Sequence, residues 1–174
     1  MAEEIFDIVN DQDEVIGLAP RADVHRQGLK HRAVHVFVFD ETGRLFIQKR
    51  SASKDTFPGR FDSSASGHVD SGEGYDACAV RELQEELGLS VPVKRLCKYF
   101  KIDACQETGW EFVWVYSLQG NLHPTINTSE IENGEFLEVG AIRNLIAGHP
   151  DQCAPSFRRI FQEVQSRGLL PPVP

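Results

Sequence analysis

Apolar residues along this chain fall into short runs that turn-forming residues separate, a pattern typical of β-strands. The strongest run, residues 33–39 (AVHVFVF), is nearly continuous and predicts a buried central strand. The turn at 40–43 favours a hairpin in which residues 45–48 pair with this strand. Trp110 and Trp114 alternate within a later run, so we expect both to pack on one face of the sheet. Further strands are predicted at residues 61–66, 93–102, 110–118 and 135–139.

Helical periodicity is clearest at residues 75–87, where apolar side chains recur every three or four residues and Gly88 follows the last of them. Two more helices are predicted at 141–147 and 154–167. Residues 5–18 read as two short strands around an NDQDE turn, which predicts a hairpin on the edge of the core domain. The chain is therefore expected to combine helices with a sheet.

The bulk composition limits the kind of protein. With 174 residues, 41% of them apolar, the chain suits one domain over residues 1–174, in which residues 1–30 form the hairpin extension. A net charge of −8 without a basic stripe argues against nucleic-acid binding. No apolar run approaches the ~20 residues of a membrane span, and the acidic start lacks the features of a signal peptide. Four cysteines without a CxxC pair favour a reducing, cytoplasmic setting.

The helix predicted at 75–87 carries an unfavourable charge pattern. Glu82, Glu85 and Glu86 share one face, and like charges at this spacing destabilise a helix by roughly a few tenths of a kcal/mol per pair. Arg81 can offset only part of this by reaching Glu85. One interpretation is a solvated acidic face. The other is a divalent cation, because Mg²⁺ takes oxygen ligands and keeps waters that a phosphate can replace.

The spacing within residues 67–89 decides between these interpretations. Seven identities at these positions arise by chance on the order of once in 10⁸ starts. They are Gly67, Glu73, Arg81, Glu82, Glu85, Glu86 and Gly88. The segment resembles the Nudix box, G-x5-E-x7-R-E-U-x-E-E-x-G-U with U apolar, and every position matches. The resemblance implies a Nudix-type α/β/α sandwich, in which a mixed sheet lies between helices, with the N-terminal β-hairpin as an extension.

The same resemblance assigns roles to the box residues. It implies that Glu82, Glu85 and Glu86 bind Mg²⁺ or Mn²⁺ together with the carbonyl of Gly67, and that Arg81 orients these carboxylates. The group that takes the proton from water varies within the family. Glu82 is the first choice, and glutamates of a later segment are the alternatives: Glu130, Glu132 and Glu135.

Residues 49–60 form a polar segment with four cations in an otherwise acidic chain. Arginine binds phosphate through two hydrogen bonds and lysine acts as a point charge, so a phosphate clamp is one interpretation. A solvated loop that balances the acidic helix is the other. With the box close by, we favour a clamp formed by Arg50 and Lys54.

The resemblance extends over residues 25–89 to the branch of the family that includes type I isopentenyl-diphosphate isomerase. It implies that Arg50 and Lys54 hold a diphosphate. It also implies that an inner metal ion is bound by residues outside the box glutamates: His25, His31, His68 and Glu111. A lone histidine is more often a hydrogen-bonded core or surface residue, which is the alternative interpretation.

Two departures from this branch favour a hydrolase. Ser66 occupies the position of the isomerase's catalytic cysteine, and a hydroxyl has a much higher pKa than a thiol. Gly109 occupies the position of a second metal-binding glutamate. We therefore expect metal-dependent hydrolysis of a phosphoanhydride in a small-molecule diphosphate, such as a nucleoside di- or triphosphate or a nucleoside diphosphate linked to another moiety. The alternatives are an isomerase and a catalytically silent nucleotide sensor. The N-terminal hairpin is compatible with a homodimer.

Overall fold

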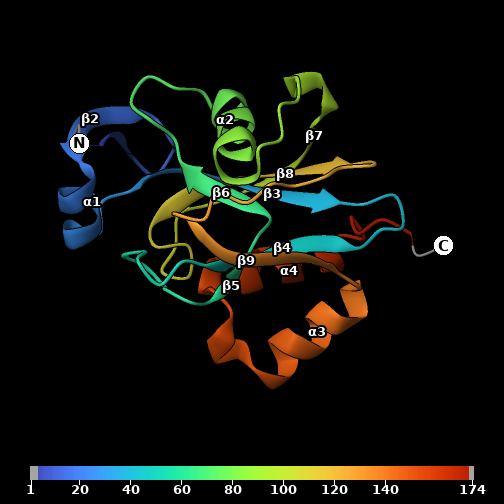
Figure 1. Cartoon of the computed structure of the whole chain (residues 1–174). Helices are drawn as coiled ribbons and strands as arrows, with labels where there is room; N and C mark the ends of the chain where they lie inside the picture. Colours follow the sequence, from blue (N-terminus) through green and yellow to red (C-terminus); the bar gives the residue numbers. More distant parts are fainter. Residues whose placement is uncertain (1–3, 173–174) are drawn as a thin grey trace.

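The structure, a computed structural model, describes residues 4–172. Figure 1 shows a central sheet with helices on both faces and a small N-terminal unit at one end. The strands are β1 (Ile5–Val9), β2 (Val15–Pro20), β3 (His31–Phe39), β4 (Leu45–Arg50), β5 (Phe61–Asp62), β6 (Ala65–His68), β7 (Cys97–Ile102), β8 (Glu111–Gln119) and β9 (Ile131–Leu137). The helices are α1 (Arg21–Gln27), α2 (Tyr75–Leu87), α3 (Val139–Gly148) and α4 (Pro155–Ser166), with short 3₁₀ turns η1 (Val93–Arg95) and η2 (Pro150–Gln152).

The main sheet has seven strands and is mixed, as the resemblance implied. Its central path runs β5-β4-β3-β8-β7, while β6 pairs with β3 and β9 pairs with β4. The β3–β8 pair is parallel and the remaining pairs are antiparallel. As predicted, the apolar run of β3 lies at the centre, where its side chains are buried on both faces.

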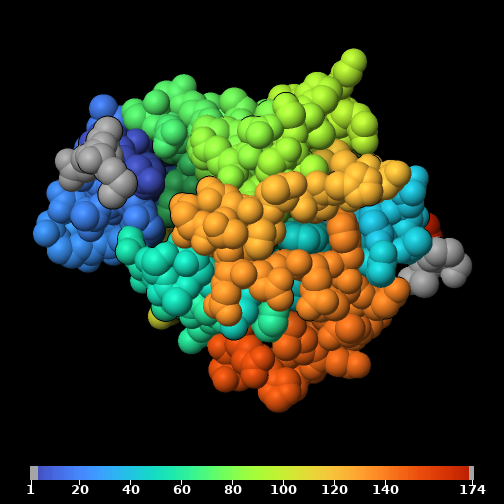
Figure 2. All heavy atoms as spheres, in the orientation of Figure 1, coloured from blue at the N-terminus to red at the C-terminus, as the bar shows by residue number. Residues whose placement is uncertain are grey.

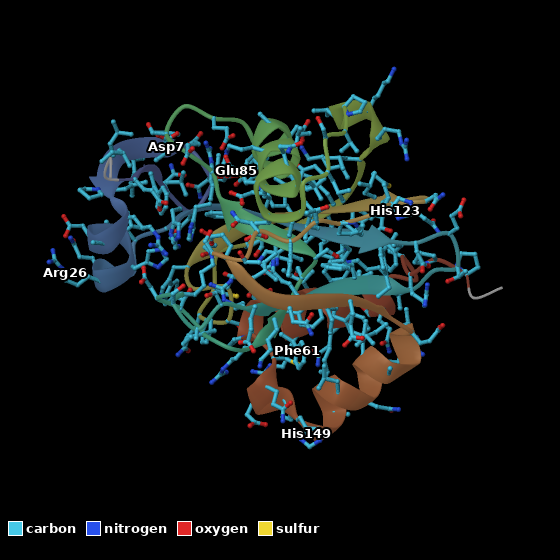
Figure 3. The ribbon with its side chains drawn as sticks, in the orientation of Figure 1. Asp7, Arg26, Phe61, Glu85, His123 and His149 are labelled. Carbon is cyan, nitrogen blue, oxygen red and sulfur yellow. The ribbon has the colours of Figure 1, made fainter. Side chains whose placement is uncertain are left out.

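Two apolar cores cover the two faces of the sheet. On one face, α2 packs Ala79 and Leu83 against the valines of β3. On the other, α4 buries the stripe that its sequence predicted, with Phe157 and Phe161 near Phe37 of β3. Phe61 of β5 packs against this second core (Figure 3). The layers therefore form the expected sandwich.

The N-terminal hairpin is also confirmed, as a two-stranded sheet of β1 and β2. Phe6 of β1 is 1% exposed and packs against the end of the main sheet, whereas β2 exposes Val15, Ile16 and Leu18. Figure 2 shows the hairpin and α1 (blue) beside the 51–60 loop (teal) and α2 (green). The homodimer stays a prediction. Within residues 4–172 no helix is long and apolar enough to cross a membrane.

The pairing expected around residues 45–66 is wrong in detail. β3 and β4 pair only at Phe39 and Leu45, because the following segment enters between them. That segment is split into β5, which pairs with β4, and β6, which pairs with β3. The split falls at two fully buried serines, and the hydroxyl of Ser64 accepts a hydrogen bond from the Val38 amide and donates one to the Phe46 carbonyl.

The tryptophan prediction is wrong as well. Trp110 lies outside β8, has a φ of 68° and is 41% exposed. A left-handed backbone is rare for a bulky residue and takes Trp110 out of the alternation that Trp114 follows. Its ring instead contacts Gly28, where a Cβ would lie 3.3 Å from the indole. The remaining differences are boundary shifts: η1 precedes β7, and β9 starts earlier than expected.

Candidate active site

A cavity of about 640 Å³ lies at the end of the sheet that the N-terminal hairpin covers. Its lining comes from α1, β3, β6 and α2, and from the loops around residues 51–60, 107–110 and 127–130. Most residues that the sequence assigned to the site lie on this cavity: His25, Arg50, Lys54, Gly67, His68, Arg81, Glu82, Glu85, Glu86, Glu111 and Glu130. His31 does not belong to the lining. Of the other two candidate bases, Glu132 pairs with Lys49 at 2.8 Å, and neither it nor Glu135 belongs to the lining.

Glu82 and Glu86 form one side of the cavity, here called the carboxylate wall. The two residues are only 8% and 3% exposed, whereas the side chain of Glu85 is 56% exposed. Burial, and then the charge of Glu86, raise the pKa of Glu82 to about 8. Burial also raises the pKa of Glu86 to about 7. Two buried carboxylates that resist losing their protons are an oxygen donor set that a divalent cation fits.

The backbone of β6 and a side chain of β4 hold Glu86 in place. Its carboxylate accepts hydrogen bonds from the amide of Ser66 at 3.1 Å and from Nε2 of Gln48 at 2.9 Å. Gly67 leaves room for the other member of the wall, because a Cβ there would lie 2.0 Å from Oε1 of Glu82. The glycine of the box is thus required by the approach of a carboxylate to the strand.

Arg81 connects the carboxylates to the loop before α2. Its Nε and Nη2 donate to Glu73 at 2.9 and 2.8 Å, and its Nη1 donates to Glu82 at 2.7 Å and to Glu85 at 3.1 Å. Nη2 also donates to the carbonyl of His68 at 3.0 Å. With its donors shared among these acceptors, Arg81 sets the orientation of Glu82.

A second polar group, here called the histidine wall, consists of His25, His31, His68 and Glu111. The register of the sheet brings three of them together. His31 lies opposite Glu111 in the parallel β3–β8 pair, and two residues later Ala33 lies opposite His68 of β6. His25 comes from α1, and Phe6 packs against all three imidazoles. The N-terminal hairpin is therefore part of the site.

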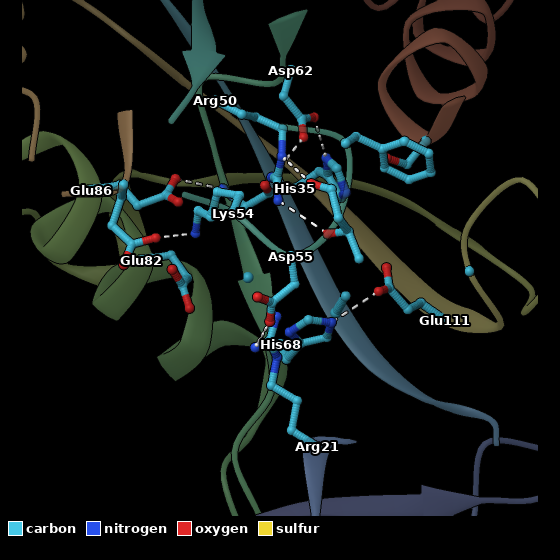
Figure 4. A pocket seen from close by; sticks show the side chains of 18 of the residues that line it. Arg21, His35, Arg50, Lys54, Asp55, Asp62, His68, Glu82, Glu86 and Glu111 are labelled. Carbon is cyan, nitrogen blue, oxygen red and sulfur yellow. Dashed lines mark hydrogen bonds and ion pairs between the residues drawn. The ribbon is translucent and has the colours of Figure 1, made fainter. Parts of the chain in front are cut away.

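The geometry of the histidine wall suits a metal ion. One ring nitrogen from each histidine lies within 4.8 Å of the other two, and Oε1 of Glu111 is 3.0 Å from Nε2 of His68 (Figure 4). Among the described residues the buried Nε2 of His25 has no hydrogen-bond partner, and the buried Nε2 of His31 faces only the carboxylate of Glu111, 3.5 Å away. Burial, and then His68 and His31, lower the pKa of His25 to about 4, which keeps it neutral as a ligand must be. Burial alone would raise the pKa of Glu111, but hydrogen bonds from His31 and His68 outweigh it and keep the pKa low.

The two basic residues expected to form a phosphate clamp, Arg50 at the end of β4 and Lys54 in the 51–60 loop, have different contacts. Arg50 donates from Nη1 to Asp62 at 3.2 Å, from Nε to the Thr56 carbonyl at 3.0 Å and from Nη2 to the Thr56 hydroxyl at 3.2 Å. Its guanidinium therefore holds the loop. Lys54 pairs with Glu130, which also lines the cavity, and the charge of Lys54 lowers the pKa of Glu86 against the larger effect of burial.

Comparison with protein families identifies the fold and its chemistry. The model of the NUDIX domain matches residues 29–159, which is most of the chain. The protein belongs to the Nudix family. It is accordingly a pyrophosphohydrolase. The matched region includes residues 67–89, where the sequence resembles the Nudix box.

Curated relatives of this Nudix protein carry different names. An isopentenyl-diphosphate Delta-isomerase 2 of Photorhabdus laumondii is 34% identical over 161 residues, which cover 91% of both chains. A prenyl-diphosphate phosphatase of Methanosarcina mazei is 31% identical and covers 89% of this chain and 94% of its own. The crystal structure of a Deinococcus radiodurans protein superimposes with a TM-score of 0.82 at 30% identity, over 92% of this chain and 98% of that one.

Arg21 and Phe57 are among the cavity residues of this Nudix chain that escaped prediction from the sequence. Arg21, the first residue of α1, lines the cavity and pairs with Asp55 of the 51–60 loop at 2.7 Å. Phe57 is 42% exposed at the cavity with a φ of 48°. Neither carries a local signal, because only the folded chain places α1 against the 51–60 loop.

Proposed function

We propose that this enzyme uses Mg²⁺ or Mn²⁺ to hydrolyse the phosphoanhydride of a small-molecule diphosphate, with a nucleoside di- or triphosphate or a nucleoside diphosphate linked to another moiety as substrate. The observation that carries the proposal is the pair of buried carboxylates, Glu82 and Glu86, at a cavity that opens to solvent. Burial raises their pKa values, so a bound cation would stabilise their ionised forms and would also neutralise charge on the diphosphate.

The carboxylate wall and the residues around it have distinct roles in this proposal. Glu82, Glu85 and Glu86 would hold the cation with the carbonyl of Gly67, and Arg81 orients them. When bound, the cation neutralises phosphate charge and lowers the pKa of a coordinated water. Lys54 lies where it can exchange Glu130 for a phosphate oxygen. Glu82 is the first choice to accept the proton of the attacking water, and Glu130 is the alternative once Lys54 has turned to the substrate.

We also propose that the histidine wall holds a second metal ion. Neutral imidazoles with one carboxylate form a donor set for a transition-metal ion such as Mn²⁺ or Zn²⁺. The Nε2 of His25 supports this, because it is buried without a partner among the described residues and buried polar atoms normally have partners.

Isomerisation of a prenyl diphosphate is the second candidate. The histidine wall and the names of two relatives favour a prenyl compound. The lining opposes it, since the described chain contributes no valine, leucine, isoleucine or methionine to the cavity. The apolar side chains that a prenyl chain would meet there are Phe6, Ala33 and Phe57. Ser66 in the position of the isomerase's cysteine opposes it too.

The test is a substrate panel with Mg²⁺ or Mn²⁺ that includes nucleotides, nucleotide sugars and prenyl diphosphates. Release of phosphate or a monophosphate product, lost in Glu86→Gln, is the expected result. Conversion of isopentenyl to dimethylallyl diphosphate without phosphate release would establish the isomerase instead. Tight nucleotide binding with no turnover under any condition would favour a sensor.

A further inference from the structure

His35 is a buried polar residue on the cavity that neither metal site uses. It lies in β3, is 4% exposed and belongs to the lining. In the sheet it is the antiparallel partner of Ser66, directly beside the carboxylate-binding segment of β6. A buried imidazole on the wall of a cavity must satisfy two ring nitrogens, and they have different surroundings here.

One ring nitrogen of His35, Nδ1, is held by a contact with Ser63. Its Nδ1 lies 2.7 Å from the hydroxyl of Ser63 and 3.9 Å from Oδ1 of Asp62. Asp62 in turn accepts hydrogen bonds from the Ser63 amide at 2.8 Å and from Arg50 at 3.2 Å. Figure 4 shows Asp62, Arg50 and His35 as one group at the cavity. The anchor fixes the plane of the imidazole.

The proton positions follow from this anchor. The hydroxyl of Ser63 is fully buried, and within residues 4–172 its hydrogen-bond partner is Nδ1 of His35. A buried hydroxyl donates its proton where it can, so Nδ1 is the acceptor. Burial lowers the pKa of His35 and so favours the neutral ring, and a neutral ring that accepts at Nδ1 carries its single proton on Nε2. Among the described residues Nε2 has no hydrogen-bond partner, so it presents a free N–H group.

The cations on the cavity are engaged, unlike this donor. Arg21 pairs with Asp55, Arg50 with Asp62, Lys54 with Glu130 and Arg81 with the box glutamates. A phosphate has to displace a carboxylate to reach any of them. The N–H group of His35 needs no such exchange, and its neutral ring adds no charge near a metal site.

We propose that His35 is a substrate-binding residue, and that its Nε2–H donates a hydrogen bond to a non-bridging oxygen of the substrate's diphosphate. This rests on the proposed function only in taking a diphosphate as the ligand. The hydrogen bond forms no covalent bond and moves no proton, so Nδ1 keeps its contact with Ser63 throughout.

Binding of methylenediphosphonate, a diphosphate that water does not cleave, tests this in the presence of Mg²⁺ by calorimetry. His35→Asn keeps an amide near Ser63 but removes the group at Nε2. We expect this variant to bind the diphosphonate with an affinity roughly tenfold lower or more, because it loses a hydrogen bond to a charged group. His35→Gln places an amide near the Nε2 position and should recover most of the affinity. His123→Asn makes the same change at an exposed site away from the cavity and should bind like the wild type.

Equal affinity of His35→Asn and wild type would overturn the proposal, and so would the absence of binding by the wild type. Nitrogen-15 NMR of the wild type gives an independent measurement that needs no variant to fold. It should show the Nε2–H tautomer at His35, and an Nδ1–H tautomer would also overturn the proposal. Binding lost in His35→Asn without turnover of any substrate would refute the hydrolase function alone. Turnover with unchanged binding would refute the role of His35 alone.

Discussion

The carboxylate wall and the histidine wall belong to one cavity but are built in different ways. Glu82 and Glu86 come from one helix within a contiguous box, whereas the histidine wall is assembled from α1, β3, β6 and β8. Burial also acts on them in opposite directions. It raises the pKa of Glu82 and Glu86, and it lowers the pKa of His25. The comparison shows that one cavity combines a wall of oxygen donors with a wall of mainly nitrogen donors.

Removing a buried carboxylate is expected to have the largest effect. Glu86→Gln keeps the shape but leaves a neutral amide facing Gln48 and the Ser66 amide, so phosphate release should fall roughly 100-fold or more. Glu85→Gln is the matched change on the exposed part of the same helix and should cost about tenfold or less, because this side chain is already solvated. Initial rates at saturating Mg²⁺ measure both. Equal losses would show that burial does not separate the two glutamates.

Filling the space beside the carboxylate wall should have the second-largest effect on activity. In Gly67→Ala the new methyl group would overlap the carboxylate of Glu82, so we expect activity roughly 10- to 100-fold lower and a stability loss of about 1–3 kcal/mol. Gly74→Ala adds the same group where nothing lies within 4 Å and should behave like the wild type. Mg²⁺ titrations and chemical denaturation provide the two readouts. An active Gly67→Ala with normal Mg²⁺ affinity would contradict the proposed placement of the cation.

The metal site proposed at the histidine wall can be tested by replacing Glu111, the one carboxylate of that wall. Glu111→Gln should weaken Mn²⁺ binding about 10- to 100-fold while Mg²⁺ binding at the carboxylate wall stays unchanged. Glu107→Gln, an exposed glutamate on the rim of the same cavity, is the control. Electron paramagnetic resonance of Mn²⁺ gives the affinities. If both variants bind Mn²⁺ with the same affinity, the proposal of a second metal site is wrong.

The pH dependence of stability should have opposite signs at the two walls when a chelator keeps the chain free of metal. Glu82 and Glu86 have raised pKa values in the folded state. Their contribution to folding stability is therefore complete below the pKa of 4.5 in the unfolded state, and it is lost as the pH rises towards about 7 to 8. His25 has a lowered pKa, so its contribution is complete above 6.5 and is lost as the pH falls towards about 4.

Between pH 6.5 and 8 only the carboxylate effect remains, and the free energy of unfolding should fall by at most about 1.4 kcal/mol per pH unit for each carboxylate. Urea denaturation across this window measures it. The double variant Glu82→Gln, Glu86→Gln should remove the slope, and Mg²⁺ should reduce it in the wild type. A wild-type stability that is constant from pH 6.5 to 8 would contradict burial of the ionised pair.

The sequence alone determined the features that depend on local periodicity and spacing. The helix at residues 75–87 and its stop at Gly88 agree with α2, because a 3.6-residue period and a left-handed glycine are local properties. The central strand, the buried stripe of α4 and the N-terminal hairpin follow for the same reason. The spacing of the box also identified the family and named the glutamates that now line the cavity.

Only the tertiary structure decided how distant segments meet. The split of residues 61–66 into β5 and β6 depends on the gap between β3 and β4, and the histidine wall depends on the register of β3 with β6 and β8. The hydrogen bonds of Arg50 to Asp62 and of His35 with Ser63 likewise join segments whose contact cannot be read from the local sequence pattern. Such contacts arise because packing of the two cores selects one register among many, and no short stretch of sequence contains that information.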